Sequence, residues 1–593
     1  MENHVIRMLL NRIEEFGDEE IIRFREKTKK SWSWNQLGEK VEQALSGLHV
    51  LGSRPGDNVG IISQNRAEWL LTDLGIMANR GVTVPLYATS SMDQIRYILN
   101  ETEIRILFVG TCEQKEMLKC LLDEDNTLEQ MVVFDECNTV DDRILSFSSF
   151  LELSQKKGLH ISISDNVSDY HSDDLATIIY SSGTTGEPKG VMLKHSHFVN
   201  AWKIHQERLE VSSEDVSLSF LPLSHVFERL WTHLMLFSRV INVFLDDPRD
   251  VVNALRQVKP TMMCVVPRFF DKTYQGIQEE MLRWSPIKQK IFNWAITTGL
   301  KANKYRSRHA ELPRTLQWKL AFSEKLVFRK LRGVFGGNIR FMPCAGAALS
   351  TEILKFFHAF GLFVTYGYGL TETSATVSCF RDDVYSYGTC GSVMPGVEVK
   401  IGDNSEILVR GASVFSGYYK KEKETQEVMT DGWFHTGDEG MLDENGDLIM
   451  TDRIKDLMKT SVGKYVSPQK IETLLQQQEL VEQIVVVGDN RPYVTALIVP
   501  LLSKLKELAL LRNIEVPEGD DLLYHPHVLQ AFEDHIHEVQ QNLAPYEKVK
   551  KVALLEEPFT MENGTMTNTL KLKRRKIEEK YKGVIDGLYG TTI

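Results

Sequence analysis

The sequence is organised around one stretch rich in glycine and hydroxyl residues, Tyr180-Ser181-Ser182-Gly183-Thr184-Thr185-Gly186-Glu187-Pro188-Lys189-Gly190. The segment Ala176–Tyr180 before it is apolar or β-prone, so we expect a strand to end there. Glycines let backbone amides approach an anion closely, and consecutive N–H groups in a turn form an anion-binding concavity. The Walker A spacing is not met, because Gly190 follows Lys189 where that motif needs a hydroxyl residue. The stretch predicts a phosphate loop of another type, while a plain turn between a strand and a helix stays open.

The composition is typical of a soluble globular protein. Apolar residues make up 42% and charged residues 25% of the 593 residues. A chain of this length is expected to form about two to four domains. The formal net charge of −12 argues against binding nucleic acid over the whole surface.

The cysteines are expected to be free thiols in a reducing cytosol. Their number is odd and no two of them have C-x-x-C spacing, so neither a disulfide framework nor a zinc site is indicated. The seven residues are Cys112, Cys120, Cys137, Cys264, Cys344, Cys379 and Cys390.

No segment has the pattern of a signal peptide or a membrane span. Met1–Phe24 mixes acidic and basic residues and is expected to be helical. The most apolar long segment, Trp231–Leu245, contains His233, Arg239 and Asn242, which predicts a buried helix followed by a strand.

Strands alternate with helices in the first part of the chain, which predicts layers of parallel α/β structure. The expected strands are Asn58–Ser63, Ile104–Gly110, Gln130–Asp135, Val240–Leu245, Met262–Val266, Ile339–Cys344 and Leu362–Thr365. The expected helices are Asn35–Leu48, Glu68–Arg80, Ser91–Glu101 and Lys194–Arg208. The fold class is therefore α/β and α+β in several domains.

The sequence pattern changes twice toward the C-terminus. Residues 375–450 are rich in glycine and short alternating strands, with a hairpin turn at Glu444–Asp447, and predict a β-rich subdomain. The residues after a boundary near Lys455 have an α+β pattern of their own. We expect an N-terminal domain over 1–454 and a smaller C-terminal domain over 455–593.

A basic helical insert occupies residues 285–332. It holds twelve Lys and Arg residues and two acidic residues, Glu311 and Glu324, with aromatic residues interleaved. A solvated helical face is one reading. The other is a surface for anionic lipid headgroups, to which each nearby basic residue contributes on the order of 1 kcal/mol.

Five further strings combine residue types that suit a nucleotide site. Leu221–Arg229 carries His225, whose neutral imidazole can donate one hydrogen bond. Thr365–Thr373 sets an aromatic ring, a hydroxyl and a carboxylate beside glycines, and Asp431–Asp438 ends in a carboxylate that can accept two ribose hydroxyls. Met458–Pro468 is a glycine-containing loop before a helix, and Thr567–Lys576 is a basic run. Each string alone also fits an ordinary loop or helix face.

Taken together and in this order, these strings resemble the adenylate-forming superfamily of acyl-CoA synthetases, luciferases and peptide-synthetase adenylation domains. The resemblance covers roughly residues 20–580. The string Leu221–Arg229, the string Val266-Pro267-Arg268 and the basic insert are closest to the long-chain fatty acid–CoA ligases of that superfamily. No chemical role is assigned to Arg268, for which a structural ion pair is an equal reading.

The resemblance implies roles for individual residues. The catalytic residues would be Lys571, His225, Thr371 and Glu372, with Lys573 as the alternative to Lys571. The ATP and coenzyme A sites would be formed by Ser181, Ser182, Gly183, Thr184, Thr185, Gly186, Lys189, Gly346, Ala347, Tyr368, Gly369, Asp438, Arg453 and Gly463. Thr184 and Glu372 would hold Mg²⁺. Two positions depart from the usual family form of the adenine loop, Ala345 and Ala348.

The implied activity is ATP-dependent conversion of a long-chain fatty acid to an acyl-adenylate with release of pyrophosphate, followed by transfer to coenzyme A. Residues 1–454 would be the adenylation domain and residues 455–593 a mobile lid that turns at Lys455. An acyl carrier protein as acceptor, a medium-chain substrate and a lipid-binding relative without activity stay open as alternatives. We expect a cytoplasmic protein, with peripheral contact to the inner face of an anionic membrane through 285–332 and a homodimer as open expectations.

Overall fold

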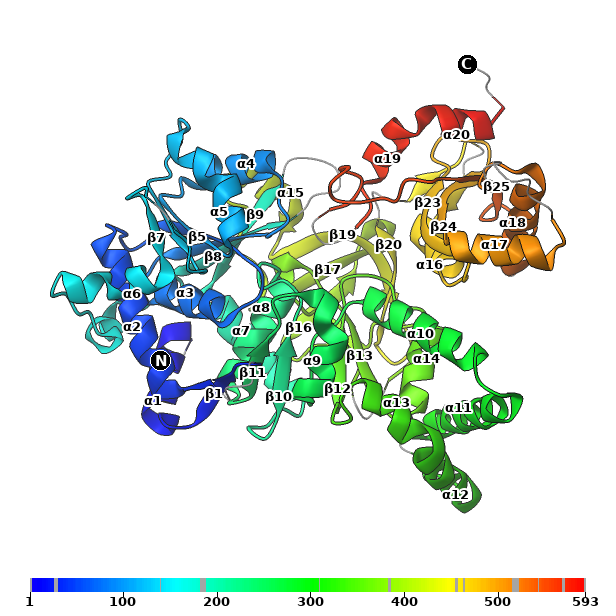
Figure 1. The fold of residues 1–593 in the computed structure, drawn as a ribbon, viewed down its shortest axis with the longest axis horizontal. Helices are drawn as coiled ribbons and strands as arrows, with labels where there is room; N and C mark the ends of the chain where they lie inside the picture. Colours follow the sequence, from blue (N-terminus) through cyan, green and yellow to red (C-terminus); the bar gives the residue numbers. More distant parts are fainter. Residues whose placement is uncertain are drawn as a thin grey trace.

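The computed structural model describes residues 3–25, 30–138, 140–181, 188–308, 310–381, 385–453, 457–461, 464–514, 522–541, 543–567 and 571–590. Figure 1 shows a large body running from the N-terminus to the yellow-green strands and a smaller orange and red body at the C-terminus. The smaller body carries the described residues from 457 onward. Lys455 itself lies outside the described residues.

The first layer of the large body is a seven-stranded sheet in the order β7-β6-β5-β3-β4-β8-β9. All neighbours are parallel except β8 and β9, which form an antiparallel hairpin around the glycine-rich stretch. The strands are β3 (Asn58–Ile62), β4 (Val82–Leu86), β5 (Ile106–Val109), β6 (Gln130–Val133), β7 (Ile144–Ser146), β8 (Leu175–Ser181) and β9 (Lys189–Lys194). Its helices are α2 (Trp34–Val50), α3 (Ala67–Ala78), α4 (Met92–Thr102), α5 (Cys112–Leu118) and α6 (Phe147–Lys156). The predicted α/β alternation is confirmed here.

A second set of strands continues in parallel from β11 to β13. Strand β11 pairs with β10, the segment around Met262 bridges β10 to β12, and β12 pairs with β13. The strands are β1 (Glu20–Arg23), β2 (Ser31–Ser33), β10 (Val216–Ser219), β11 (Ile241–Phe244), β12 (Phe341–Cys344), β13 (Phe363–Tyr368), β14 (Ser378–Cys379) and β15 (Ser392–Val393). The helices around them are α1 (Val5–Phe16), α7 (His195–Arg208), α8 (Val226–Phe237), α9 (Val251–Val258), α10 (Pro267–Leu282) and α14 (Thr351–Ala359).

Two strand and helix predictions differ from the structure in detail. The expected strand Met262–Val266 makes single parallel bridges at Met262 and Val265 instead of a continuous ladder. The N-terminal segment is helical only to Phe16, because the apolar pair that follows pairs as β1 beside β11. The expected helix and strand in Trp231–Leu245 are α8 and β11. Among the described helices, none is both long and apolar enough to cross a membrane.

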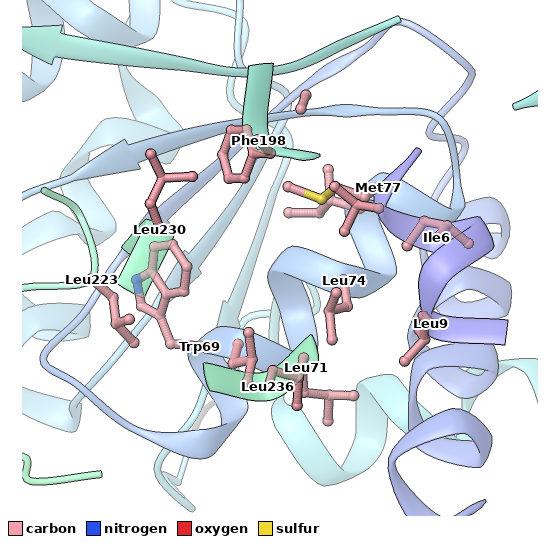
Figure 2. Close-up of a cluster of buried hydrophobic side chains, with 14 of the residues drawn as sticks. Ile6, Leu9, Trp69, Leu71, Leu74, Met77, Phe198, Leu223, Leu230 and Leu236 are labelled. Atoms are coloured by element: carbon pink, nitrogen blue, oxygen red, sulfur yellow. The ribbon is translucent and has the colours of Figure 1, made fainter. Parts of the chain in front are cut away.

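The largest core lies where α1, α3, α7 and α8 meet. Figure 2 shows Ile6 and Leu9 of α1 facing Leu74 of α3, with Phe198 of α7 and Leu236 of α8 beside them. All five side chains are essentially inaccessible to water. Burial of such side chains stabilises by about 1.5–3 kcal/mol each, so this contact fixes α8 and the loop that precedes it.

The β-rich subdomain is a five-stranded antiparallel sheet in the order β16-β17-β19-β18, in which β20 also pairs with β19, on the edge that β18 occupies. Its strands are β16 (Val397–Ile401), β17 (Glu406–Gly411), β18 (Met429–Thr430), β19 (Trp433–Leu442) and β20 (Leu448–Arg453), and α15 (Glu422–Val428) lies before β18. The predicted hairpin turn joins β19 to β20, and Gly446 takes the positive φ of 79° that the turn requires.

The C-terminal body packs helices on a three-stranded sheet in the order β23-β24-β25. Its strands are β21 (Met458–Lys459), β22 (Tyr465–Val466), β23 (Val481–Val487), β24 (Val494–Pro500) and β25 (Val549–Leu554). Its helices are α16 (Pro468–Gln476), α17 (Leu502–Leu511), α18 (Pro526–Val539), α19 (Arg574–Lys580) and α20 (Lys582–Leu588). Ser467 donates a hydrogen bond of 2.5 Å to Asp452 on β20, which ties this body to the large one.

The basic insert is helical, as predicted. It forms α11 (Pro286–Arg306), α12 (Arg314–Ser323), a π-helical turn over Glu324–Phe328 and α13 (Arg329–Val334). In Figure 1, α11 and α12 extend away from the sheets at the lower right.

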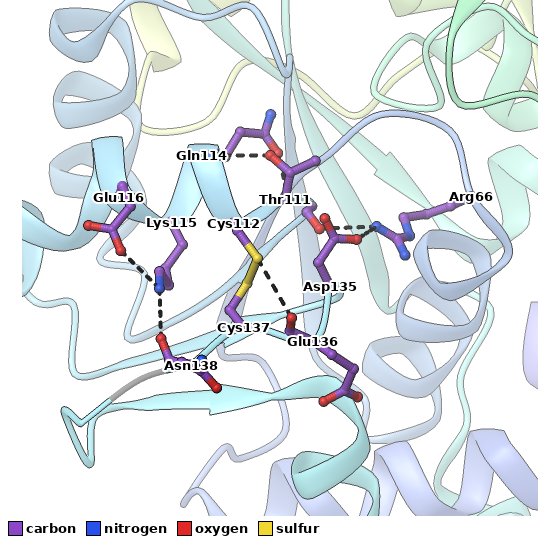
Figure 3. The surroundings of a disulfide bond; sticks show 11 residues. Arg66, Thr111, Cys112, Gln114, Lys115, Glu116, Asp135, Glu136, Cys137 and Asn138 are labelled. Atoms are coloured by element: carbon purple, nitrogen blue, oxygen red, sulfur yellow. Dashed lines mark hydrogen bonds and ion pairs between the residues drawn. A yellow bond between two sulfur atoms is a disulfide. The ribbon is translucent and has the colours of Figure 1, made fainter.

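One prediction about the cysteines is wrong. Cys112 and Cys137 form a disulfide, with their Cα atoms 5.8 Å apart, as Figure 3 shows. The pairing arises because Cys112 opens α5 directly after β5, while Cys137 follows the neighbouring parallel strand β6. Carboxyl ends of adjacent parallel strands lie at one edge of the sheet, so residues 25 apart in sequence become neighbours. The other five cysteines are free thiols.

Candidate active site

Three of the predicted strings leave one edge of the second sheet. The strands β10, β12 and β13 run parallel, with Met262 bridging the first two. Their carboxyl ends carry Leu221–Arg229, the loop 345–349 and the loop 369–373. In open α/β sheets ligands bind outside the carboxyl ends of strands, so the geometry places a single candidate site there.

The phosphate hairpin is described only at its base. Ser181 and Lys189 are paired across β8 and β9, and the hydroxyl of Ser181 donates to the Lys189 carbonyl at 3.5 Å. The predicted ligands Ser182, Gly183, Thr184, Thr185 and Gly186 lie outside the described residues. The base is anchored by Tyr180, whose hydroxyl donates to Glu101 on α4.

Tyr418 connects this hairpin with the predicted metal ligand, and sequence reasoning missed it. The segment around Tyr418 pairs along β9, bridging to Val191. The ammonium of Lys189 lies 4.9 Å from the centre of the Tyr418 ring, and the Tyr418 hydroxyl donates to Oε1 of Glu372 at 2.9 Å. Lys189 therefore makes a cation–π contact with the Tyr418 ring, and the Tyr418 hydroxyl orients the Glu372 carboxylate.

Glu372 lies beside Thr371 in the short 3₁₀ turn Thr371–Thr373, where both residues are half-buried. Burial raises the pKa of the Glu372 carboxyl, and the hydrogen bond from Tyr418 opposes that rise. A carboxylate so placed gains from a nearby cation. One such carboxylate, with substrate phosphates and water, is the set that Mg²⁺ usually takes. The donor set fits a magnesium ion.

The predicted base and ribose residues come together from three strands. Tyr368 ends β13, and its hydroxyl donates to Oδ2 of Asp438 on β19 at 2.6 Å. Arg453, opposite Asp438 on β20, places its Nε 3.3 Å from Oδ1 of that carboxylate. Asp438 is only 2% exposed, so its charge depends on these partners. Adenine stacking and ribose binding remain predictions for this cluster.

Glycine occupies two positions of the site, 369 and 346, for different structural reasons. A Cβ atom at Gly369 would lie 1.5 Å from the carbonyl oxygen of Ala375, so only glycine lets the loop close on itself. Gly346 has a φ of +93° and open space around it, and with Ala347 it presents exposed backbone. Their loop leaves β12 beside β13, so this backbone lies next to the strand that ends at Tyr368.

The charge of Lys571 acts on His225, although the two residues are 346 positions apart in the sequence. His225 caps α8, and its Nδ1 accepts the backbone N–H of Phe227 at 3.2 Å. Burial, and then the positive charge of Lys571, lower the pKa of His225 to about 4. The ring is therefore neutral near pH 7, and its proton resides on Nε2, which can donate. The alternative residue Lys573 is half-buried, and burial lowers its pKa.

A buried polar network holds α8 against the phosphate-loop sheet. Arg229 donates from Nε to Asp73 of α3 at 2.9 Å and from Nη1 to Thr177 of β8 at 2.7 Å. Asp73 also accepts from Thr83 of β4 at 2.7 Å, and His233 lies 3.0 Å from it. Arg229 and Asp73 are completely buried. The sequence marks Arg229 by its motif, but nothing local indicates Asp73 as its partner.

Two residues singled out in the sequence, Gly463 and Arg268, add nothing to the geometry of the site. Gly463 lies outside the described residues. Arg268 is the second residue of α10 and half-buried, and no chemical role follows from its position. Its charge opposes the effect of burial, which raises the pKa of Asp271 to about 6.

Comparison with known proteins gives the family. A model described as "AMP-binding enzyme" matches residues 9–419, and one described as "AMP-binding enzyme C-terminal domain" matches residues 455–592. A long-chain-fatty-acid–CoA ligase of Mycobacterium bovis is 33% identical, over 93% of this chain and 91% of the relative. The peroxisomal long chain acyl-CoA synthetase 7 of Arabidopsis thaliana is 31% identical, over 94% of this chain and 82% of the relative.

Solved structures show the same fold at lower identity. The A domain of a carboxylic acid reductase from Segniliparus rugosus, in complex with AMP and a co-purified carboxylic acid, has a TM-score of 0.76 at 19% identity, covering 99% of this chain and 94% of that one. The anthranilate CoA ligase AuaEII, in complex with anthranoyl-AMP, has a TM-score of 0.74 at 19% identity, covering 98% of both chains. These likenesses, with the family models, confirm the predicted architecture and family. The chain belongs to the AMP-binding, adenylate-forming enzymes.

Proposed function

We propose that this chain is an AMP-forming long-chain fatty acid–CoA ligase. The observation that carries the proposal is the convergence of Leu221–Arg229, the loop 345–349 and the loop 369–373 at the carboxyl ends of β10, β12 and β13. Two relatives of this chain, at 33% and 31% identity, are named long-chain ligases or synthetases. Fatty acid, ATP and coenzyme A are its substrates. Acyl-adenylate formation followed by transfer to coenzyme A is the reaction sequence that we assign to it.

In the first half-reaction a carboxylate oxygen of the fatty acid attacks the α-phosphorus of ATP. A new P–O bond forms, the bond to the β-phosphate bridging oxygen breaks, and pyrophosphate leaves with the electron pair. His225 orients the attacking carboxylate by donating from Nε2, and the ammonium of Lys571 offsets charge on the α-phosphate. Such transfers depend on positioning and charge neutralisation, which these two groups supply.

Ser181 to Gly186 and Lys189 hold the β- and γ-phosphates, and Thr371 contacts the α-phosphate. Tyr368 stacks on adenine beside the backbone of Gly346, Ala347 and Gly369, while Asp438 and Arg453 bind ribose. Glu372 and Thr184 would hold Mg²⁺, which when bound would neutralise phosphate charge. The Tyr418 hydroxyl keeps the Glu372 carboxylate in position for it.

In the second half-reaction the thiol of coenzyme A attacks the acyl carbonyl. A thioester bond forms, the bond to AMP breaks, and the thiol proton goes to solvent. We assign the loop at Gly463 to this step. Lys571 and Gly463 both belong to the C-terminal body, so a turn at Lys455 can exchange one for the other. Domain movements of this kind commonly limit turnover.

Two variants separate the half-reactions. Lys571→Ala should abolish fatty-acid-dependent pyrophosphate release and spare thioester formation from supplied acyl-AMP, because only the first step builds charge at the α-phosphate. Gly463→Leu should do the reverse. Equal loss of both steps in either variant would contradict the assignment of that residue.

The substrate is tested by an acyl series from short to long chains, with coenzyme A or acyl carrier protein as acceptor. A maximum at long chains with coenzyme A supports the proposal. A maximum at medium chains, or transfer only to the carrier protein, would favour those alternatives. Absence of fatty-acid-dependent pyrophosphate release would favour a lipid-binding relative without activity.

We also propose that the protein works in the cytoplasm, peripheral on the inner face of the membrane through residues 285–332. Its substrate is an amphiphile that partitions into lipid, which supports such a location. Fractionation of cells with and without salt washing tests the location, and light scattering of the purified chain tests whether it is a homodimer.

A further inference from the structure

One helical face of the insert has apolar side chains turned to solvent. Trp318 is 72% exposed, Phe322 58% and Leu326 47%. They are spaced by four residues along the rod formed by α12, the π-helical turn and α13, so they form one stripe. Other residues of the same rod, Val327, Phe328 and Leu331, are buried in a hydrophobic core that includes residues of β12 and α14. The rod is thus packed on one side and carries an uncovered aromatic stripe on another.

Basic side chains flank this stripe. Lys319, Lys325, Arg329 and Lys330 are all exposed. The one acidic residue between 314 and 332, Glu324, is bound to Arg332 on the packed side. Arg332 also donates to the carbonyl of Phe360 in the body at 2.6 Å. Glu324 therefore does not neutralise the basic side chains next to the stripe, although the chain as a whole has a net charge of −12.

The arrangement distinguishes between kinds of partner. Protein interfaces are depleted in lysine relative to the rest of the surface, whereas three lysines border this stripe. Tryptophan and phenylalanine bordered by Lys and Arg are the composition of a helix that lies in a lipid interface. The long basic side chains can extend to headgroups while their stems lie along the apolar layer. Figure 1 shows α12 at the outer end of the insert, where a flat surface can reach it.

We propose that this stripe, defined as Trp318, Phe322 and Leu326 with the flanking Lys319, Lys325, Arg329 and Lys330, docks on anionic lipid bilayers. It rests on the proposed peripheral location and gives that location a surface and a partner. The three apolar side chains enter the acyl–headgroup boundary, and the four basic side chains bind lipid phosphates. The adenylation site lies in a different part of the body, so docking and chemistry are separable.

The test uses the full chain and sedimentation with vesicles of phosphatidylcholine, alone or mixed in equal parts with phosphatidylglycerol. The unmodified chain should bind the mixed vesicles, and less tightly as salt is raised. Lys325→Gln with Arg329→Gln should weaken binding to the mixed vesicles by roughly 30-fold, about fivefold for each charge. Trp318→Ser with Phe322→Ser should weaken it by roughly a hundredfold.

A matched control comes from the C-terminal body. Leu510 and Leu511 are 76% and 80% exposed on α17, so Leu510→Ser with Leu511→Ser removes a comparable exposed apolar pair. The control pair should bind vesicles as the unmodified chain does. Equal weakening by the control pair and the stripe pair would overturn the assignment of the surface, as would tight binding to pure phosphatidylcholine.

Tryptophan quenching reports the same contact without depending on affinity. Brominated acyl chains in the mixed vesicles should quench part of the emission, and Trp318→Phe should remove that part, while Trp294→Phe should not. Quenching unchanged by Trp318→Phe would refute the insertion of this residue. Self-association that the stripe variants abolish, without any vesicle binding, would assign the face to a second copy and overturn the proposal.

Ligase activity on a dissolved long-chain fatty acid, without vesicles, separates this inference from the proposed function. All stripe variants should keep that activity. Vesicle binding with no activity in any form would leave the surface supported and the proposed function wrong, and activity with no vesicle binding would do the opposite.

Discussion

Replacement of Arg229 by methionine tests how the fold positions the candidate site. Arg229 is completely buried, and its guanidinium bridges Asp73 of α3 and Thr177 of β8. Methionine has similar bulk and no charge, so Arg229→Met leaves the Asp73 carboxylate buried with only neutral donors, Thr83 and His233. The helix affected is the one that His225 caps.

The expected cost follows from burial of an unpaired charge. Removing one partner of a buried ion pair typically destabilises by about 3–5 kcal/mol, because the remaining charge keeps its desolvation penalty. That is a large part of the roughly 5–15 kcal/mol by which a native domain is stable. We expect the loss of stability in Arg229→Met to lie in the upper part of the range of about 3–5 kcal/mol. A double variant, Asp73→Leu with Arg229→Met, should be less destabilised than Arg229→Met alone, since no charge remains.

The measurement is denaturant unfolding, with hydrogen exchange at the amides of α8 to identify the transition that includes this helix. This is needed because a chain with several domains need not unfold in one step. A cost below about 1 kcal/mol for Arg229→Met, or a double variant as unstable as the sum of its parts, would refute the reasoning. Pyrophosphate release should fall in Arg229→Met, because α8 then holds His225 less firmly.

The difference in stability between the unmodified protein and Arg229→Met depends on pH, and the sign of that dependence follows from the pKa of Asp73. Burial alone raises the pKa of Asp73, but the Arg229 guanidinium and His233 overcome it and hold that pKa well below its ordinary value. The stability from this group is therefore present above the unfolded-state pKa of about 3.9 and is lost as the pH falls through the folded-state value. In Arg229→Met burial dominates, so the pKa of Asp73 rises and stability falls as the pH rises past 3.9. The difference between the two proteins should be largest near neutral pH and shrink in acid.

Three further predictions concern the site and its surroundings. Tyr418→Phe removes a hydrogen bond to the Glu372 carboxylate that is worth about 1.5–3 kcal/mol. The variant should raise the Mg²⁺ concentration for half-maximal pyrophosphate release at least about tenfold. An unchanged Mg²⁺ requirement would exclude Glu372 from the metal site. Gly369→Ala forces a Cβ atom within 1.5 Å of a loop carbonyl, and should lower stability by about 3 kcal/mol and lower the turnover number in the same assay; a variant with normal stability would show that the loop can move. Cys112→Ser opens a loop of 25 residues and should cost about 2–4 kcal/mol in thermal unfolding without reductant, whereas Cys120→Ser should cost almost nothing.

Much of the fold could be predicted because its signals are local. The strands Asn58–Ser63 and Gln130–Asp135 and the helix Lys194–Arg208 have periodicities that short segments reveal, and the structure has β3, β6 and α7 at those places. The segment around Met262 was misjudged because it is apolar and buried yet pairs at single positions. Its hydrogen bonds are decided by neighbouring strands, which a short window cannot represent.

The candidate site was predictable where its residues belong to short strings and not where they depend on packing. Tyr418 stands 46 residues from Glu372, and its importance comes only from the hydroxyl that reaches that carboxylate. The disulfide was missed for the same reason, since Cys112 and Cys137 become neighbours through parallel strand pairing.

The sequence alone determined the family, the order of the motifs and the chemistry that each motif can perform, because residue type and close spacing are local properties. It also determined that residues 285–332 are helical and basic. Only the tertiary structure decided which groups meet. Parallel pairing of β10, β12 and β13 brings three loops to one edge, and the charge of Lys571 in the C-terminal body acts on His225. The same packing buries one side of the insert helix and leaves Trp318 exposed, because burial depends on the shape of the whole molecule.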